Sequence, residues 1–78
     1  MQKRKRKTPM PKEVVQLGKK IAQIIEQKDL KQRDVAHDAG MDVENLRKYI
    51  KGIQEMKVST LIRIAKALKC RPGDLIDK

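Results

Sequence analysis

The chain has 78 residues, the size of one small domain, and its 20 Lys and Arg against 10 Asp and Glu give a net charge of +10. Its single Cys excludes an internal disulfide and a cysteine-based zinc site. No apolar run approaches the roughly 20 residues that cross a bilayer, and no apolar stretch follows the first basic residues as in a signal peptide. The sequence therefore predicts neither a membrane span nor a secretion signal.

The positive charge is concentrated at the N-terminus, where residues 1–12 contain six basic residues and no acidic residue. Such a segment repels itself and has too little apolar surface to offset the entropy lost on ordering. We therefore predict a flexible basic arm over residues 1–11 and a folded domain over residues 12–78. The basic side chains of the arm are Lys3, Arg4, Lys5, Arg6 and Lys7.

The net charge also predicts a polyanionic partner. Proteins that bind single-stranded nucleic acids usually stack the bases on aromatic side chains. This chain has no Trp or Phe, and its single Tyr, Tyr49, falls on the apolar face of a predicted helix. Duplex DNA is therefore the favoured polyanion.

The first predicted helix runs from about residue 11 to residue 28, because Pro11 suits a first helical turn. Its apolar side chains recur at steps of three and four residues, which places them on one face. They are Val14, Leu17, Ile21, Ile24 and Ile25. Gly18 lies within this helix, where we expect it to permit close packing against another element rather than to break the helix.

Two short helices are predicted next, over about residues 32–39 and 43–51. Gly40 joins them in a tight turn, because glycine adopts the positive φ that ends a helix without a Cβ clash. Asp42 occupies the N-cap position of the second helix, and Gly52 ends it. Small Ala36 lets the two backbones approach. This pattern indicates a helix-turn-helix, in which the second helix is free to enter the major groove of DNA.

Two further helices complete the predicted bundle. One spans about residues 58–69, and a short one starts at Arg71 and Pro72, since proline suits a first turn. Asp74 complements the positive end of the short helix, and we expect Leu75 and Ile76 to dock it. The inward side chains predicted for the longer helix are Leu61, Ile64, Ala65 and Leu68.

Three stretches resemble the phage-repressor/Cro family of bacterial helix-turn-helix regulators, often called the XRE family. They are LGKKIAQII (residues 17–25), LKQRDVAHDAGMDVENLRKYIKG (30–52) and LIRIAKALKCRPGDLI (61–76). Ala36, Gly40 and Leu46 have the spacing that is typical of the family. The resemblance implies a compact, all-α, lambda-repressor-like bundle of five helices that binds operator DNA, usually as a dimer. It also implies a bacterial, cytoplasmic protein associated with the nucleoid.

In this family the bases are read from the first turns of the second helix of the motif, which implies Val43, Glu44 and Arg47 as base-reading residues. Arg47 can fork onto O6 and N7 of guanine, Glu44 can accept a hydrogen bond from a cytosine amine, and Val43 can meet a thymine methyl. For Glu44 an equally weighted alternative is a solvated acid that is favourable at the positive end of the helix.

Other polar residues around the motif are expected at phosphates. Gln32 heads the first helix of the motif, where a glutamine of the family commonly bonds a phosphate and braces the recognition helix. Lys31 and Arg33 flank it and add electrostatic attraction without sequence information. The full set of expected phosphate-binding residues is Lys31, Gln32, Arg33, Asn45, Lys48 and Lys51.

One position pair departs from the family pattern. Many members carry an arginine late in the first helix and a glutamate at the end of the third, which form a partly buried ion pair. This chain has Ile25 and Ile50 there. Replacing both partners of a buried pair by apolar residues is often neutral or stabilising, whereas losing one is costly. We therefore expect Ile25 to contact Ile50, and the arm to compensate for the phosphate contact that Ile25 cannot make.

The sequence predicts no catalytic constellation, no cofactor and no metal site, and hence no enzyme. His37 is expected on the exposed side of its helix without a second His nearby, and Cys70 as a small, half-buried residue at a helix end. Asp34 and Asp38 lie one turn apart, but no base, nucleophile or phosphate-binding loop accompanies them.

Three functions therefore stay open, in decreasing order of support. The first is a sequence-specific regulator, most readily a repressor, that binds double-stranded DNA and occupies an operator. The second is an antitoxin-type module that binds a toxin-type protein partner and represses its own gene. The third is a non-specific basic nucleic-acid binder in which the arm dominates. A homodimer is compatible with the first two, and no membrane partner is expected.

Overall fold

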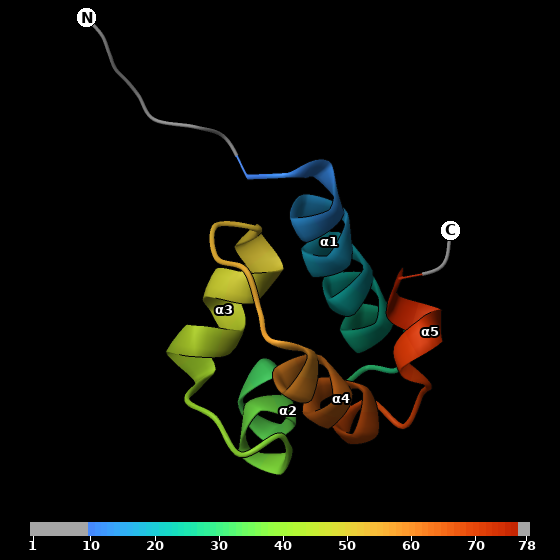
Figure 1. Ribbon diagram of the computed structural model, residues 1–78. Coiled ribbons are helices and arrows are strands. Elements are labelled where there is room, and N and C mark those ends of the chain that lie inside the picture. The colour runs from blue at the N-terminus through green and yellow to red at the C-terminus, as the bar shows by residue number, and fades with distance from the viewer. Residues whose placement is uncertain (1–9, 77–78) are drawn as a thin grey trace, which may run out of the picture.

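The computed structural model describes residues 10–76 as a bundle of five helices without a strand (Figure 1). The basic side chains of the expected arm, residues 3–7, lie outside the described residues. The helices are α1 (Lys12–Gln27), α2 (Gln32–Asp38), α3 (Val43–Lys51), α4 (Val58–Ala67) and α5 (Pro72–Ile76). Each predicted helix is confirmed, and the bounds differ from the predicted ones by at most two residues. Among these residues, no helix is long and apolar enough to cross a membrane.

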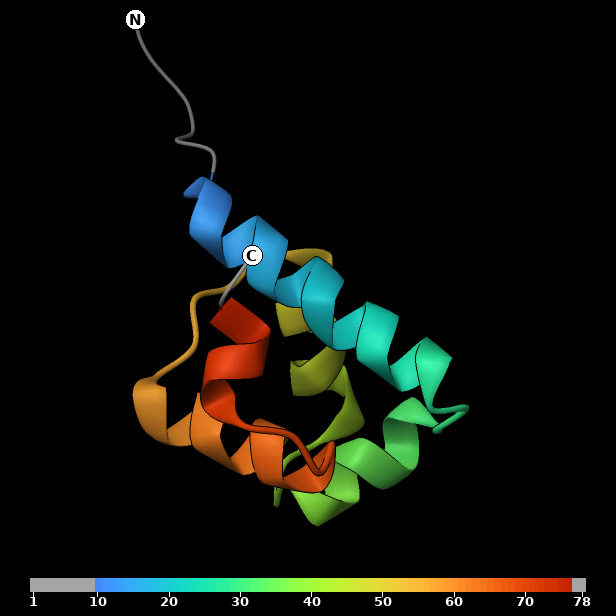
Figure 2. The ribbon, with the colours of Figure 1, turned by 90° about the vertical axis from the view of Figure 1, so that its right-hand side faces the viewer.

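The core is built from one face of each helix. Its fully enclosed large side chains come from four helices: Ile21, Val35, Leu46 and Ile64, with Leu68 directly after α4. The fifth helix adds Leu75, which is 3% exposed, and packs between α1 and α4 (Figure 2). The apolar periodicity of the sequence therefore predicted the core of α1 and α4 correctly, with Val14, Leu17 and Leu61 half-buried at its edge.

The expectation that both Leu75 and Ile76 dock α5 is wrong for Ile76, whose side chain is 60% exposed. Neighbouring residues of a helix point about 100° apart, because an α-helix has 3.6 residues per turn. A helix of five residues that turns Leu75 into the core must therefore turn Ile76 largely toward solvent.

Gly18 lies where α1 crosses α3. A Cβ atom at this position would meet the backbone carbonyl oxygens of Tyr49 and Ile50, the latter at 2.6 Å. The expectation of close packing at Gly18 is confirmed, since the helix continues through it without a break. The crossing sets α3 directly against the long helix α1, and it therefore determines how far α3 stands out from the bundle.

The turn between α2 and α3 has the geometry of a Schellman motif. Gly40 has a φ of 72°, its N–H donates to the carbonyl of His37 over 3.0 Å, and the N–H of Met41 donates to that of Ala36 over 2.9 Å. Gly52 ends α3 in the same way, with a φ of 73°. Asp42 occupies the predicted N-cap position of α3, but its carboxylate makes no capping hydrogen bond.

Candidate nucleic-acid interface

The two faces of α3 differ sharply in chemistry. Leu46 is fully buried, while Val43, Tyr49 and Ile50 are half-buried and pack against the core. The remaining side chains of the helix are all exposed and all polar: Glu44, Asn45, Arg47, Lys48 and Lys51. Val43 thus differs from the other two residues expected to read bases, because part of its surface is already used in packing.

Arg47 connects the two helices of the motif. Its Nε donates to Oε1 of Gln32, the first residue of α2, over 3.2 Å. Its Nη1 donates to Oε2 of Glu44 over 3.3 Å, which makes an ion pair between positions three apart on α3. The structure therefore brings two expected base-reading residues and one expected phosphate-binding residue into a single hydrogen-bonded group.

This group borders an open hollow of about 430 Å³, which we call the α2 hollow. It is lined by Lys31, Gln32, Arg33, Asp34 and Arg47. Three of these five side chains are cationic, and one is anionic. Lys31, Gln32 and Arg33 were expected at phosphates, and the hollow places them beside the exposed face of α3. The local charge suits an anion such as a backbone phosphate.

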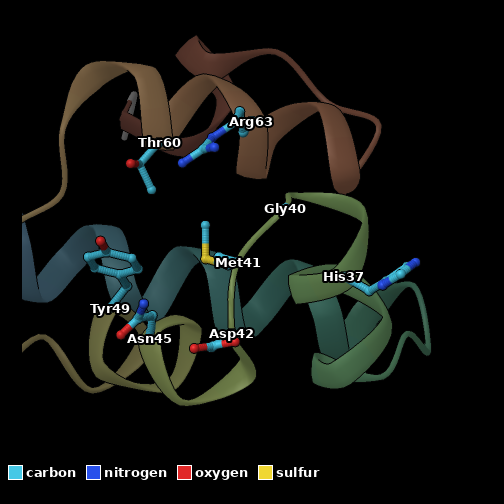
Figure 3. A pocket seen from close by; sticks show the side chains of 8 residues that line it. All are labelled: His37, Gly40, Met41, Asp42, Asn45, Tyr49, Thr60 and Arg63. Carbon is cyan, nitrogen blue, oxygen red and sulfur yellow. The ribbon is translucent and has the colours of Figure 1, made fainter.

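A second open hollow of about 610 Å³, the α4 hollow, lies on the other side of α3, between α3 and the start of α4 (Figure 3). Its lining is His37, Gly40, Met41, Asp42, Asn45, Tyr49, Thr60 and Arg63. Met41 stands between the two helices, and Arg63 reaches over it from α4. Asn45 lines this hollow, so it is separated from Lys31, Gln32 and Arg33 at the α2 hollow.

Sequence reasoning missed Arg63 as a residue of this surface. No local signal marks it, because it lies on a helix predicted only to fill the core. In the structure its Nη1 would be 3.9 Å from a Cβ at Gly40, at the end of α2. A cation there complements the negative end of α2, and it also adds positive charge to the α4 hollow.

Cys70 and His37 occupy the positions expected of them. His37 is exposed, and Cys70 is half-buried after the end of α4. Burial raises the pKa of the Cys70 thiol, as does the nearby carboxylate of Asp74, while Lys28 opposes them. The raised pKa favours the protonated thiol, which is the less reactive form. Among residues 10–76, no group of three or more His, Cys, Asp or Glu could hold a metal ion.

Comparison with protein-family models places the chain in a known family. The model for Cro/C1-type helix-turn-helix DNA-binding domains matches residues 20–77. The chain therefore belongs to the family of Cro/C1-type helix-turn-helix DNA-binding domains, which is typical of DNA-binding regulators. Among curated proteins, none matches the sequence.

Solved structures with the same fold include several regulatory proteins. The restriction-modification controller protein C.AhdI from Aeromonas hydrophila superposes with a TM-score of 0.80 at 22% identity, covering 83% of this chain and 98% of that one. The clp gene regulator ClgR from Corynebacterium glutamicum has a TM-score of 0.80 at 21% identity, covering 86% of this chain and 71% of that one. The P22 c2 repressor protein, in complex with a synthetic operator, has a TM-score of 0.71 at 20% identity, covering 78% of this chain and 92% of that one.

Proposed function

We propose that this protein is a sequence-specific regulator that reads the major groove of duplex DNA with α3 and represses transcription by occupying an operator. The observation that carries this proposal is the exposed polar face of α3, on which Arg47 is oriented by Gln32 of the preceding helix. An exposed helix with a positioned guanidinium next to a basic hollow suits base reading beside a phosphate contact. The structure of the P22 c2 repressor with an operator supports the same mode of binding.

In this arrangement the base contacts come from Val43, Glu44 and Arg47, and the α2 hollow takes a phosphate of one strand. Lys31 and Arg33 supply charge there, and the Gln32 amide NH2 supplies a donor, because its Oε1 already accepts from Arg47. Lys48 and Lys51 add phosphate contacts from α3. Asn45 and Arg63 face the α4 hollow and are suited to a phosphate on the other side of the groove.

The test is to select duplexes from a random pool and then to titrate salt against a selected duplex and a random one. A sequence-specific protein holds a large affinity ratio between the two duplexes at every salt concentration, although both affinities fall as salt displaces the phosphate contacts. Equal affinities for both duplexes would instead show the non-specific basic binder.

A protein partner is a second proposal, favoured by the apolar side chains that α4 and the loop before it expose. Val58 is 72% exposed, Ile53 57% and Ile62 38%. Val58 and Ile62 lie one turn apart on the same face. We propose a second copy of the chain as the partner, because a dimer reads two half-sites. Light scattering of the purified protein tests this. Co-purification of a small toxin-type protein would instead favour the antitoxin alternative. One of the similar structures, the SinR–SinI complex, contains a protein–protein interface and is the reason for including this test.

A further inference from the structure

We infer that Glu44 determines DNA specificity by positioning Arg47, and not by contacting a base of its own. This inference deepens the proposed function and rests on it. The sequence left Glu44 with two roles, as an acceptor for a cytosine amine or as a solvated acid. The structure shows a third arrangement, in which the carboxylate is a hydrogen-bond partner of the neighbouring arginine.

The geometry of Arg47 explains why two partners are needed. A guanidinium is planar and rigid, but it stands at the end of a flexible side chain. The bond from Nε to Gln32 holds one edge of the plane, at 3.2 Å, and the bond from Nη1 to Glu44 holds another, at 3.3 Å. Two partners on two different helices together restrict both the position and the tilt of the plane, which a single contact does not.

These two contacts leave the far end of the guanidinium available. Of the five N–H groups, one on Nη1 and both on Nη2 make neither of these bonds, and two neighbouring N–H groups of a guanidinium match the spacing of O6 and N7 on guanine. Arg47 can therefore approach a guanine end-on while its bonds to Gln32 and Glu44 persist. Base reading then requires no exchange of partners and little loss of side-chain entropy on binding.

The role of the pair is orientation rather than stability. The side chains of Arg47 and Glu44 are 49% and 76% exposed, and such exposed ion pairs contribute little to folding. The carboxylate does, however, bring a negative charge close to the phosphates of bound DNA. Such a charge weakens binding to every duplex, so an acid on this surface is useful only where it improves discrimination.

Glu44→Ala should therefore change affinity and specificity in opposite directions. Removal of the negative charge should tighten binding to a random duplex. Loss of the carboxylate acceptor should lower the affinity ratio between selected and random duplexes by about tenfold, which is within the range of one bidentate base contact. Glu13→Ala removes the same charge from the first turn of α1, on another element, and should leave the ratio unchanged.

A double-mutant cycle of Glu44→Ala and Arg47→Ala separates positioning from direct base contact. Positioning predicts that both single variants lose preference at the same base pair, and that the double variant discriminates no less than Arg47→Ala alone. If the two single variants lose preference at different base pairs, and these losses add in the double variant, the inference is overturned, because Glu44 then reads its own base. The proposed regulator function would stand in that case.

A measurement without DNA tests the contact between Glu44 and Arg47 separately from DNA binding. In NMR spectra of the free protein, the Arg47 Nη–H protons should be protected from solvent exchange, and Glu44→Ala should weaken that protection. Exchange that is equally fast in the wild type and in Glu44→Ala would overturn the positioning role. Protection without any duplex preference would instead refute the proposed sequence-specific function and leave the pair as a surface feature.

Discussion

Arg47 and Gln32 are 15 positions apart in the chain, yet one hydrogen bond of 3.2 Å joins them. At the scale of single residues, this contact distinguishes Arg47 from Lys48 and Lys51 on the same helix. The lysines are flexible point charges, which suit phosphates of any sequence, whereas an oriented guanidinium can select a base. Residues with similar charge on one helix are therefore expected to have different roles.

Arg47→Ala should weaken binding to a selected duplex by about 1–3 kcal/mol and relax the preference at one base pair. Lys51→Ala is the matched control, since it removes a cation from the last turn of the same helix. It should weaken all duplexes nearly equally. Fluorescence titrations against a set of duplexes with single base-pair changes measure both effects. If Arg47→Ala keeps its affinity and its preferences, α3 does not read DNA through this side chain.

Lys69 illustrates backbone strain at the residue scale. It has a φ of 60°, in the left-handed region, and it ends α4 with the same hydrogen-bond pattern that Gly40 gives α2. Lys28 supports this end by donating from Nζ to the carbonyl of Leu68 over 2.6 Å. Because that contact is made to the backbone, it does not require a lysine at position 69.

Lys69→Gly should therefore raise the free energy of unfolding by about 1 kcal/mol, because glycine adopts positive φ without the clash of a Cβ. Lys66→Gly removes the same charge at a position with helical backbone, and it should lower the free energy of unfolding by about 1 kcal/mol. Urea unfolding followed by circular dichroism compares the two variants. If both variants are less stable than the wild type, the Lys69 side chain contributes more to stability than the strain of its positive φ costs.

At the scale of elements, the crossing of α1 and α3 decides how the recognition helix is presented. The carbonyls of Tyr49 and Ile50 lie against Gly18, so the contact is between backbones and no side chain can yield. Ile25 is 6% exposed and Ile50 is half-buried against the same core. The Ile50 side chain therefore does not project into solvent, which the replacement of the family ion pair by two apolar residues requires. Direct contact between the two isoleucines stays a prediction.

Gly18→Ala should destabilise the protein by about 1–3 kcal/mol or more, even though alanine has the higher helix propensity. The added methyl group can only be accommodated if α3 moves away from α1. Gln23→Ala, on the exposed side of α1, should change stability by less than about 0.5 kcal/mol. Thermal unfolding measures both variants. An unchanged melting temperature for Gly18→Ala would mean that the two helices separate without cost.

At the scale of the whole molecule, charge is distributed between two parts of the chain. All 10 acidic residues lie at positions 13–77 of the sequence, while five cations are grouped in residues 3–7. We propose that this basic segment follows phosphates or enters a neighbouring minor groove, as basic arms do in other helix-turn-helix proteins. It would then add affinity without adding sequence information.

Deletion of residues 1–8 should lower affinity for selected and random duplexes alike. It should also flatten the slope of log affinity against log salt by about 0.9 for each phosphate that the shortened chain no longer binds. The ranking of duplexes should change little, because the residues of α3 remain. Salt titrations of the full and shortened chains test this. An identical slope for both would show that the arm does not bind DNA and is only a solubilising tail.

The sequence by itself determined the helices, most of the core and the family. These features depend on local chemistry: apolar residues at steps of three and four define helical faces, and Gly40 and Gly52 mark the two ends where a positive φ is needed. The Schellman hydrogen bonds at these ends span only a few residues, so their signals can be read without knowledge of the rest of the molecule.

Only the tertiary structure decided which side chains meet across the bundle. It joined Arg47 to both Gln32 and Glu44, turned Ile76 outward and set Arg63 beside the end of α2. Such outcomes depend on the crossing angles and rotations of whole helices, which the packing of the entire core sets together. A residue's type and spacing show which interactions it is able to make, whereas only the packed fold shows which of them it makes.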